Sequence, residues 1–161
     1  MSDTRLIASA KKNRYQLQFC PHPNVLPYRH LFQTDPAVHI LDERLSYQQV
    51  FAESDLILTD YSSTAFDFAY LKKPIIYSQF DRQAFFSGQI YSRGYFDYEK
   101  DGFGEVETTY DGTVDRLIEY MENGCQMKPK YTNRVDSFFA FNDQKNCERV
   151  YQRIRELLDQ T

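Results

Sequence analysis

Residues 54–77 read SDLILTDYSSTAFDFAYLKKPIIY, and this stretch decides the fold. Leu56–Thr59 is a short, apolar, β-prone run, which is typical of a strand buried on both faces. Turn and helix-capping residues follow at 60–63, and apolar residues then recur at helical spacing over 64–71. A second β-prone run at 75–77 completes the pattern. The order strand, turn, helix, strand predicts a βαβ unit with parallel strands.

The polar turn at 60–63 (DYSS) is the first candidate site. The backbone N–H groups of Ser63, Thr64 and Ala65 are expected to be unpaired in the first helical turn, beyond the carboxyl end of the strand. Open parallel sheets hold ligands at that edge, and an anion suits such N–H groups. The sequence therefore predicts phosphate recognition by Ser62 and Ser63. The alternative is that these two serines only cap a helix.

Two carboxylates flank this turn. A carboxylate beside a phosphate site repels the phosphate unless it is neutralised or turned away. We expect Asp60 to accept backbone N–H bonds and to fix the turn. Asp67, one turn into the helix, is either an acceptor for a ligand hydroxyl or the partner of a neighbouring side chain, and the sequence leaves both open.

A second candidate lies in the stretch Pro21-His22-Pro23, directly after a strand predicted over 15–19. Two prolines fix the backbone on either side of His22, so the imidazole is expected to be held by a stiff loop at the carboxyl end of that strand. An imidazole can donate to a phosphate or act as an acid or base near neutral pH. The alternative is a loop histidine that is satisfied by backbone groups. If the two strands are parallel, His22 and the Ser62-Ser63 turn face one crevice.

Composition narrows the class of protein. The chain has 161 residues, 42% of them hydrophobic, which is enough for one domain with a substantial core. Its formal net charge of −4 argues against a nucleic-acid-binding surface. Three widely spaced cysteines and three separate histidines suggest neither a disulfide framework nor a metal site, and no apolar run is long enough for a membrane span. The start of the chain suggests a piece of a longer protein.

The remaining segments extend the alternation of strands and helices, which predicts a Rossmann-like, three-layer α/β/α domain with a parallel sheet. Helices are expected over 6–13, 25–32, 47–54 (capped by Ser46), a segment capped by Thr113 and ending at 123–124, and 142–158, with a further strand at 38–41. Residues 78–110 are rich in aromatic residues and predict a long, ordered loop packed on the domain.

The longest of these patterns is very similar to a family signature. Residues 55–77 resemble the signature of the CDP-glycerol glycerophosphotransferase family, the teichoic acid primases and polymerases. Pro21-His22-Pro23 is similar to the His-Pro element of that family, and residues 94–104 resemble its aromatic loop. Arg134, with the segments at 138–139 and 143–149, is similar to its C-terminal element.

The resemblance implies a fold and an activity. Family members resemble two-domain GT-B transferases, and this chain is similar to the nucleotide-binding C-terminal half, so residues 1–161 are expected to be one donor-binding domain, with 78–110 as a loop within it. The implied reaction transfers glycerol phosphate, or a related alditol phosphate, from a CDP-activated donor to a hydroxyl of a bacterial cell-wall or capsular polymer, with release of CMP. The substrate is the only ligand that the resemblance implies; no metal-binding residue is assigned, and the need for a divalent metal ion stays open. The isolated chain is expected to bind nucleotide without turnover, because the catalytic base and the acceptor site belong to the other half.

The resemblance also implies roles for individual residues. His22 is expected to contact or protonate the donor pyrophosphate as the catalytic residue. Substrate-binding residues are expected around it and around the serine turn: Pro23, Asp60, Tyr61, Ser62, Ser63, Thr64, Asp67 and Arg134. The full-length protein is expected in the cytoplasm, at the inner face of the membrane and attached through the other half.

Two other functions fit the same residues. A GT-B glycosyltransferase domain that uses another nucleotide sugar would share the fold and the phosphate turn. A non-catalytic module that binds phosphate or polymer would share the site without the reaction.

Overall fold

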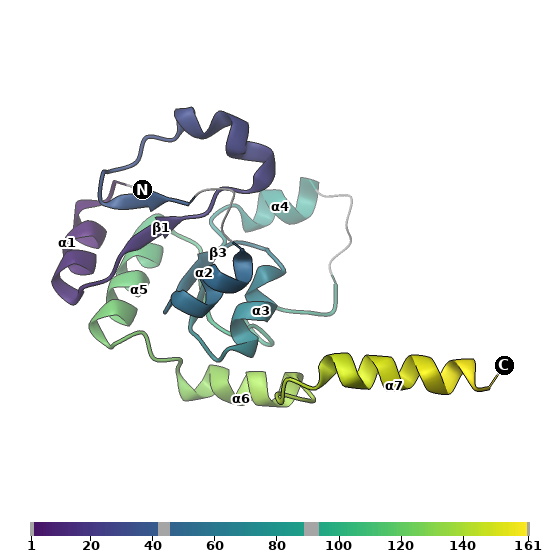
Figure 1. Cartoon of the computed structure of the whole chain (residues 1–161). Helices are drawn as coiled ribbons and strands as arrows, with labels where there is room; N and C mark the ends of the chain where they lie inside the picture. Colours follow the sequence, from purple (N-terminus) through teal and green to yellow (C-terminus); the bar gives the residue numbers. More distant parts are fainter. Residues whose placement is uncertain (1, 42–45, 89–93, 161) are drawn as a thin grey trace.

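The structure, a computed structural model, describes residues 2–41, 46–88 and 94–160. Strands and helices alternate along most of the chain (Figure 1). In chain order they are α1 (Thr4–Asn13), β1 (Leu17–Phe19), the 3₁₀ helix η1 (Pro23–Leu31), β2 (Val38–Ile40), α2 (Tyr47–Glu53), β3 (Ile57–Thr59), α3 (Thr64–Tyr70), β4 (Ile75–Ser78), α4 (Arg82–Gly88), β5 (Glu105–Glu107), α5 (Tyr110–Glu122), α6 (Pro129–Phe138) and α7 (Asn146–Leu158).

All strand pairs in the described part of the chain are parallel. β1 pairs with β2, while β3, β4 and β5 form a second sheet in that order. The predicted βαβ unit is confirmed, because β3 and β4 pair in parallel and α3 connects them. Parallel strands need such a crossover connection.

The two faces of β4 are covered by different helices. Ile75 and Tyr77 belong to one buried cluster, with residues of α2, α3 and α6. Ile76, which points to the opposite face, belongs to a second cluster with residues of α1 and α5. Because successive side chains of a strand alternate between faces, this division confirms the three-layer α/β/α arrangement. Leu17 of β1 and Leu56 pack on the second cluster and tie the two sheets together.

The prediction that Leu56–Thr59 is buried on both faces is wrong. Leu58 is 45% exposed, and β3 lies at the edge of its sheet in the described residues. The strand with buried faces is β4, whose Ile75, Ile76 and Tyr77 are fully buried between β3 and β5. Both runs are short and apolar, and only the strand order decides which of them is central.

Three local predictions need correction. The segment expected as a helix at 25–32 is 3₁₀ rather than α, and it contains Pro27, whose ring would clash with the carbonyl four residues earlier in an α-helix. Thr109 caps α5 by accepting from the N–H of Gly112 at 3.1 Å, so Thr113 lies within the helix. Residues 78–110 contain a helix, α4, and a strand, β5, although residues 89–93 of this segment lie outside the description.

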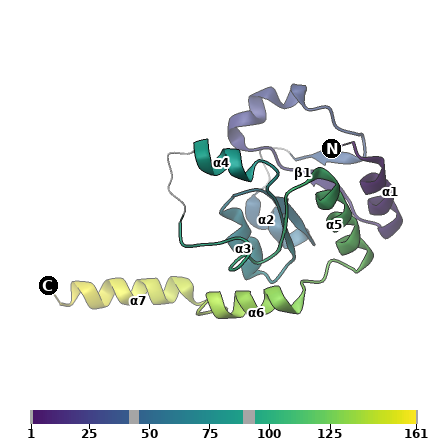
Figure 2. The ribbon, with the colours of Figure 1, turned by 180° about the vertical axis from the view of Figure 1, so that it is seen from behind.

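The end of the chain departs from the compact body. Helix α7 projects away from the α/β layers, and the view from behind shows the same extension (Figures 1 and 2). Its apolar side chains recur at helical spacing and are exposed: Val150, Tyr151, Ile154, Leu157 and Leu158. None of the described helices is both long and apolar enough to span a bilayer.

Candidate functional site

The turn after β3 is held by hydrogen bonds of its own side chains. The Asp60 carboxylate accepts the N–H of Ser62 at 3.1 Å, as the sequence predicts. The Oγ of Ser62 lies 2.9 Å from the Oγ1 of Thr64 and accepts the Thr64 N–H at 3.3 Å. Ser62 therefore acts as the local cap, and the side chain of Ser63, at the formal N-cap, makes no capping bond. Ser63 is exposed.

The expectation of three unpaired N–H groups is wrong for two of them. Thr64 donates to the Ser62 side chain, and Ala65 donates to the Ser62 carbonyl at 3.3 Å. The Ala65 bond, which reaches back three residues, tightens the first turn of α3 in the 3₁₀ manner. Within the described part of the chain, only the Ser63 N–H keeps no partner among the three. A ligand at this turn would therefore meet the N–H and the Oγ of Ser63.

Aromatic residues from the following segment fix the position of Tyr61. Its ring stacks on Phe85 of α4 with the centroids 3.7 Å apart, and its hydroxyl donates to Asp81 at 3.0 Å. The Tyr98 hydroxyl donates to the Tyr61 carbonyl at 3.1 Å. Burial, and secondly the bond to Asp81, raise the pKa of Tyr61 to about 12, so the hydroxyl remains a donor at neutral pH. The turn is thus fixed both by its own hydrogen bonds and by contacts with residues of the following segment.

His22 occupies a different setting. It precedes η1, and its Nδ1 accepts the N–H of Asn24 at 3.2 Å. In the neutral ring the proton then lies on Nε2, which makes Nε2 the available donor. The side chain is exposed, and among the described residues its carbonyl and Nδ1 bond only within η1, to Val25 and Asn24. The imidazole is free to meet a ligand.

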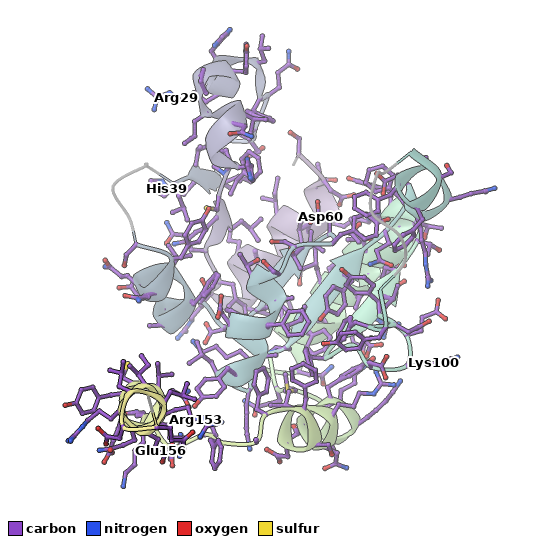
Figure 3. All side chains as sticks on the ribbon, turned by 90° about the vertical axis from the view of Figure 1, so that its right-hand side faces the viewer. Arg29, His39, Asp60, Lys100, Arg153 and Glu156 are labelled. Atoms are coloured by element: carbon purple, nitrogen blue, oxygen red, sulfur yellow. The ribbon has the colours of Figure 1, made fainter. Side chains whose placement is uncertain are left out.

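The two turns follow strands of different sheets. His22 comes three residues after the end of β1, and Asp60 comes directly after β3. In Figure 3 Asp60 lies between η1, which carries the labelled Arg29, and helix α4. Among the described contacts, none joins His22 to residues 60–64. Their sharing of one ligand stays a prediction.

The other predicted site residues are placed as follows. Arg134 of α6 donates to the carbonyls of Gly102 and Glu99 at 2.6 and 2.9 Å, and so fastens the aromatic segment to α6. Asp67 is exposed on α3 and lines a cavity between α3 and the α6–α7 junction. Pro23 begins η1, and its side chain lies outside the described part.

Sequence reasoning missed the residues that support the turn. Phe85, Asp81 and Tyr98 all come from residues 78–110, which the sequence predicted only as an aromatic segment packed on the domain. The high aromatic content of that segment predicts that it packs on the domain. It does not predict which of its rings contacts Tyr61. Within the described ranges, no three His, Cys, Asp or Glu side chains gather closely enough to hold a metal ion.

Comparison with known proteins decides the family. The sequence model of the CDP-glycerol:poly(glycerophosphate) glycerophosphotransferases matches residues 1–156. The chain belongs to this family. The resemblance of residues 55–77 is thereby confirmed.

Individual members of the glycerophosphotransferase family are similar to different extents. The chain is 43% identical over 157 residues to the minor teichoic acid biosynthesis protein GgaB of Bacillus subtilis, a match that covers 98% of this chain and 17% of GgaB. It is 30% identical over 101 residues to the teichoic acid glycerol-phosphate transferase of Staphylococcus aureus, covering 63% of this chain and 25% of that protein. The chain therefore corresponds to a minor part of the length of these relatives.

A solved structure supports the fold. The wall teichoic acid polymerase TagF superposes with a TM-score of 0.67 at 21% identity, over 99% of this chain and 39% of the TagF chain. At this identity the match concerns the fold alone.

Proposed function

We propose that this chain is the donor-nucleotide-binding part of a CDP-glycerol, or related CDP-alditol, phosphotransferase that acts in teichoic acid or capsular polymer synthesis and releases CMP. The observation that carries the proposal is family membership over nearly the whole chain. The two turns after β1 and β3, with an exposed imidazole and an exposed serine, are compatible with a diphosphate ligand.

The proposed chemistry is a phosphoryl transfer. An acceptor hydroxyl attacks the phosphorus that carries the alditol, a new P–O bond forms, and the bond to the bridging oxygen of the diphosphate breaks. CMP leaves with the electron pair, and the hydroxyl proton goes to a base outside this chain. Such a reaction needs charge stabilisation and positioning above all.

Each turn has a proposed role in that reaction. The Nε2–H of His22 donates to the diphosphate oxygens and stabilises the departing CMP. The N–H and Oγ of Ser63 bind a phosphate oxygen, and Ser62, Thr64 and Asp60 hold the turn in shape. Tyr61 keeps α4 beside it.

Partners and location follow from the same proposal. The chain binds the activated donor, and a further part of a longer enzyme binds the polymer acceptor and supplies the base. The chain alone then binds the donor without turnover. The longer enzyme works at the cytoplasmic face of the membrane, where nucleotide-activated donors are available, and the other part makes the membrane contact.

Titration calorimetry with CDP-glycerol, CMP and a UDP-sugar tests this function. We expect CDP-glycerol and CMP to bind, and Ser63→Ala to weaken CDP-glycerol binding about tenfold, because a hydrogen bond to a charged phosphate is lost. Ser137→Ala is a matched control, since the hydroxyl of this exposed serine of α6 bonds, among the described residues, only to the Asn133 carbonyl at 2.8 Å.

The alternatives give distinct results. Preference for the UDP-sugar would overturn the proposal in favour of another nucleotide-sugar transferase. Binding of inorganic phosphate with no preference for cytidine nucleotides would instead indicate a phosphate-binding module.

A further inference from the structure

A cavity that the proposed function does not use lies between α3 and the end of α6. The cavity, of about 440 Å³, opens between α3 and the junction of α6 with α7. In Figure 1 this junction lies below α3, where α7 leaves the body. Its walls include Phe66, Asp67 and Tyr70 from α3, and Phe138, Phe141 and Asn146 from the junction.

The polar groups of the cavity have unused hydrogen-bonding capacity. Among the described residues, the Asp67 carboxylate has no hydrogen-bond or ion-pair partner, and the buried hydroxyl oxygen of Tyr70 has none either. The Oδ1 of Asn146 accepts from Arg149 at 2.9 Å, which leaves its Nδ2 as a free donor within the described part. A carboxylate acceptor and an amide donor thus line one cavity without a mutual bond, while the Tyr70 hydroxyl is buried behind its wall.

The remaining walls are aromatic. Phe138 is 42% exposed and Phe141 is 54% exposed, although both belong to the hydrophobic junction. Phe138 is fixed from behind, because its ring packs against Phe66 and Phe103 with centroids 5.5 and 5.2 Å away. The cavity therefore combines firmly held ring faces with unsatisfied polar groups, as pockets for small ligands generally do.

Charge decides which ligand fits. The lining residues include no Lys or Arg, and Asp67 is the only carboxylate among them in the described structure. The nearby Arg149 guanidinium, 3.7 Å from the centroid of the Phe141 ring, is paired with Asp143. A negative carboxylate repels a phosphate but accepts hydrogen bonds from hydroxyl groups. The C–H faces of a polyhydroxylated unit can rest on the rings while its hydroxyls meet Asp67 and Asn146.

We infer that this cavity binds a neutral, hydroxyl-rich unit, a sugar ring or an alditol, of the polymer that accepts the transferred group, and so adds a contact on this chain to the acceptor site proposed for the further part of the enzyme. The assignment to the acceptor rests on the proposed function, whereas the ligand class rests on the walls of the cavity. Asp67 then belongs to this cavity and not to the phosphate turn.

Ligand-observed NMR with methyl glucoside and with ribitol, on the full 161-residue chain, tests the inference. We expect one of these neutral probes to bind, and the one that binds identifies a sugar or an alditol unit. Asn146→Ala should weaken that binding about fivefold, because a free amide donor is lost. The matched control is Asn133→Ala, an exposed asparagine of α6 outside the cavity, which should bind as the unaltered chain does.

The variant Asp67→Asn and the ligand CDP-glycerol distinguish a failure of this inference from a failure of the proposed function. Asp67→Asn should weaken probe binding about tenfold, because it removes the charged acceptor. If neither probe binds a chain that binds CDP-glycerol, or if Asn146→Ala leaves probe binding unchanged, the inference is overturned and the proposed function stands. If a probe binds as expected but CDP-glycerol does not bind, the ligand class is supported and the proposed function fails.

Discussion

The turns after β1 and β3 end comparable parallel strands, yet they are built differently. Side chains within the turn after β3 bond to one another, and Tyr98 and Phe85 hold it from the aromatic segment. The turn after β1 has Pro21 and a short 3₁₀ helix, and its imidazole is exposed. The turn after β3 is anchored by several contacts from the aromatic segment, whereas the hydrogen bonds of His22 among the described residues are local.

This difference suggests a division of labour. A turn fixed by many contacts can present a serine in one geometry, which suits the binding of a phosphate. An imidazole fixed through one ring nitrogen can donate from the other and can adjust to a changing charge. Substitutions in the two turns should therefore have unequal effects.

The largest expected effect is on stability. Tyr61→Ala removes a stacked ring and a hydrogen bond to Asp81, and should lower the free energy of unfolding by about 2 kcal/mol. His22→Ala removes one cap acceptor and should cost about 0.5 kcal/mol. Urea denaturation of both variants measures the difference. Equal losses would show that the two turns are anchored alike.

Within the turn after β3, Ser62 and Ser63 should differ. Ser62→Ala removes the oxygen that accepts the Thr64 N–H, and should lower the free energy of unfolding by about 1 kcal/mol. Ser63→Ala should leave it nearly unchanged, because that side chain makes no capping bond. Thermal unfolding of the two variants side by side measures this. A larger loss of stability for Ser63→Ala than for Ser62→Ala would show that Ser63, and not Ser62, caps the helix.

A smaller effect is expected from the aromatic segment. Tyr98→Phe keeps the ring but deletes the hydrogen bond to the Tyr61 carbonyl, and should destabilise the chain by about 0.7 kcal/mol. Amide hydrogen exchange should accelerate at residues 61–64 more than in η1. Uniform acceleration across both turns would contradict a separate anchor for the turn after β3.

The smallest effect concerns alkaline pH. The pKa of Tyr61 is raised by burial and by Asp81 from its ordinary value of 10.0 to about 12. The neutral phenol is therefore favoured in the folded chain, and its contribution to stability is complete below pH 10 and is lost as the pH rises through about 12. The phenolate absorbance of the unaltered chain minus that of Tyr61→Phe follows this group. A titration centred at its ordinary value would contradict the tight packing of Tyr61.

Local patterns predicted most of the fold. Residues 54–77 indicated the βαβ unit, and Ser46, Asn123 and Gly124 marked helix ends that the structure has. The burial of β4 rather than β3 was not predictable, because both runs are apolar and strand order depends on distant residues. The apolar stripe of α7 predicted a helix, but periodicity alone does not tell whether a partner covers it.

As with the fold, the local contacts of the site could be predicted from the sequence and the long-range contacts could not. The sequence indicated Asp60 as the acceptor that fixes the turn, and the structure confirms that bond. It could not indicate that Ser62 would satisfy the amides of Thr64 and Ala65, since a 3₁₀ first turn depends on backbone geometry. Nor could it show that Arg134 would hold the carbonyls of Glu99 and Gly102, because these residues are distant in sequence.

The most direct test of the account follows His22 and Ser63 together during one titration. Isotope-labelled chain is titrated with CDP-glycerol, and the NMR signals of the His22 imidazole and the Ser63 amide are recorded. Both signals should shift and give the same dissociation constant, because one diphosphate meets both turns. A shift of only one of them, or of neither while the nucleotide binds elsewhere, would contradict the shared site.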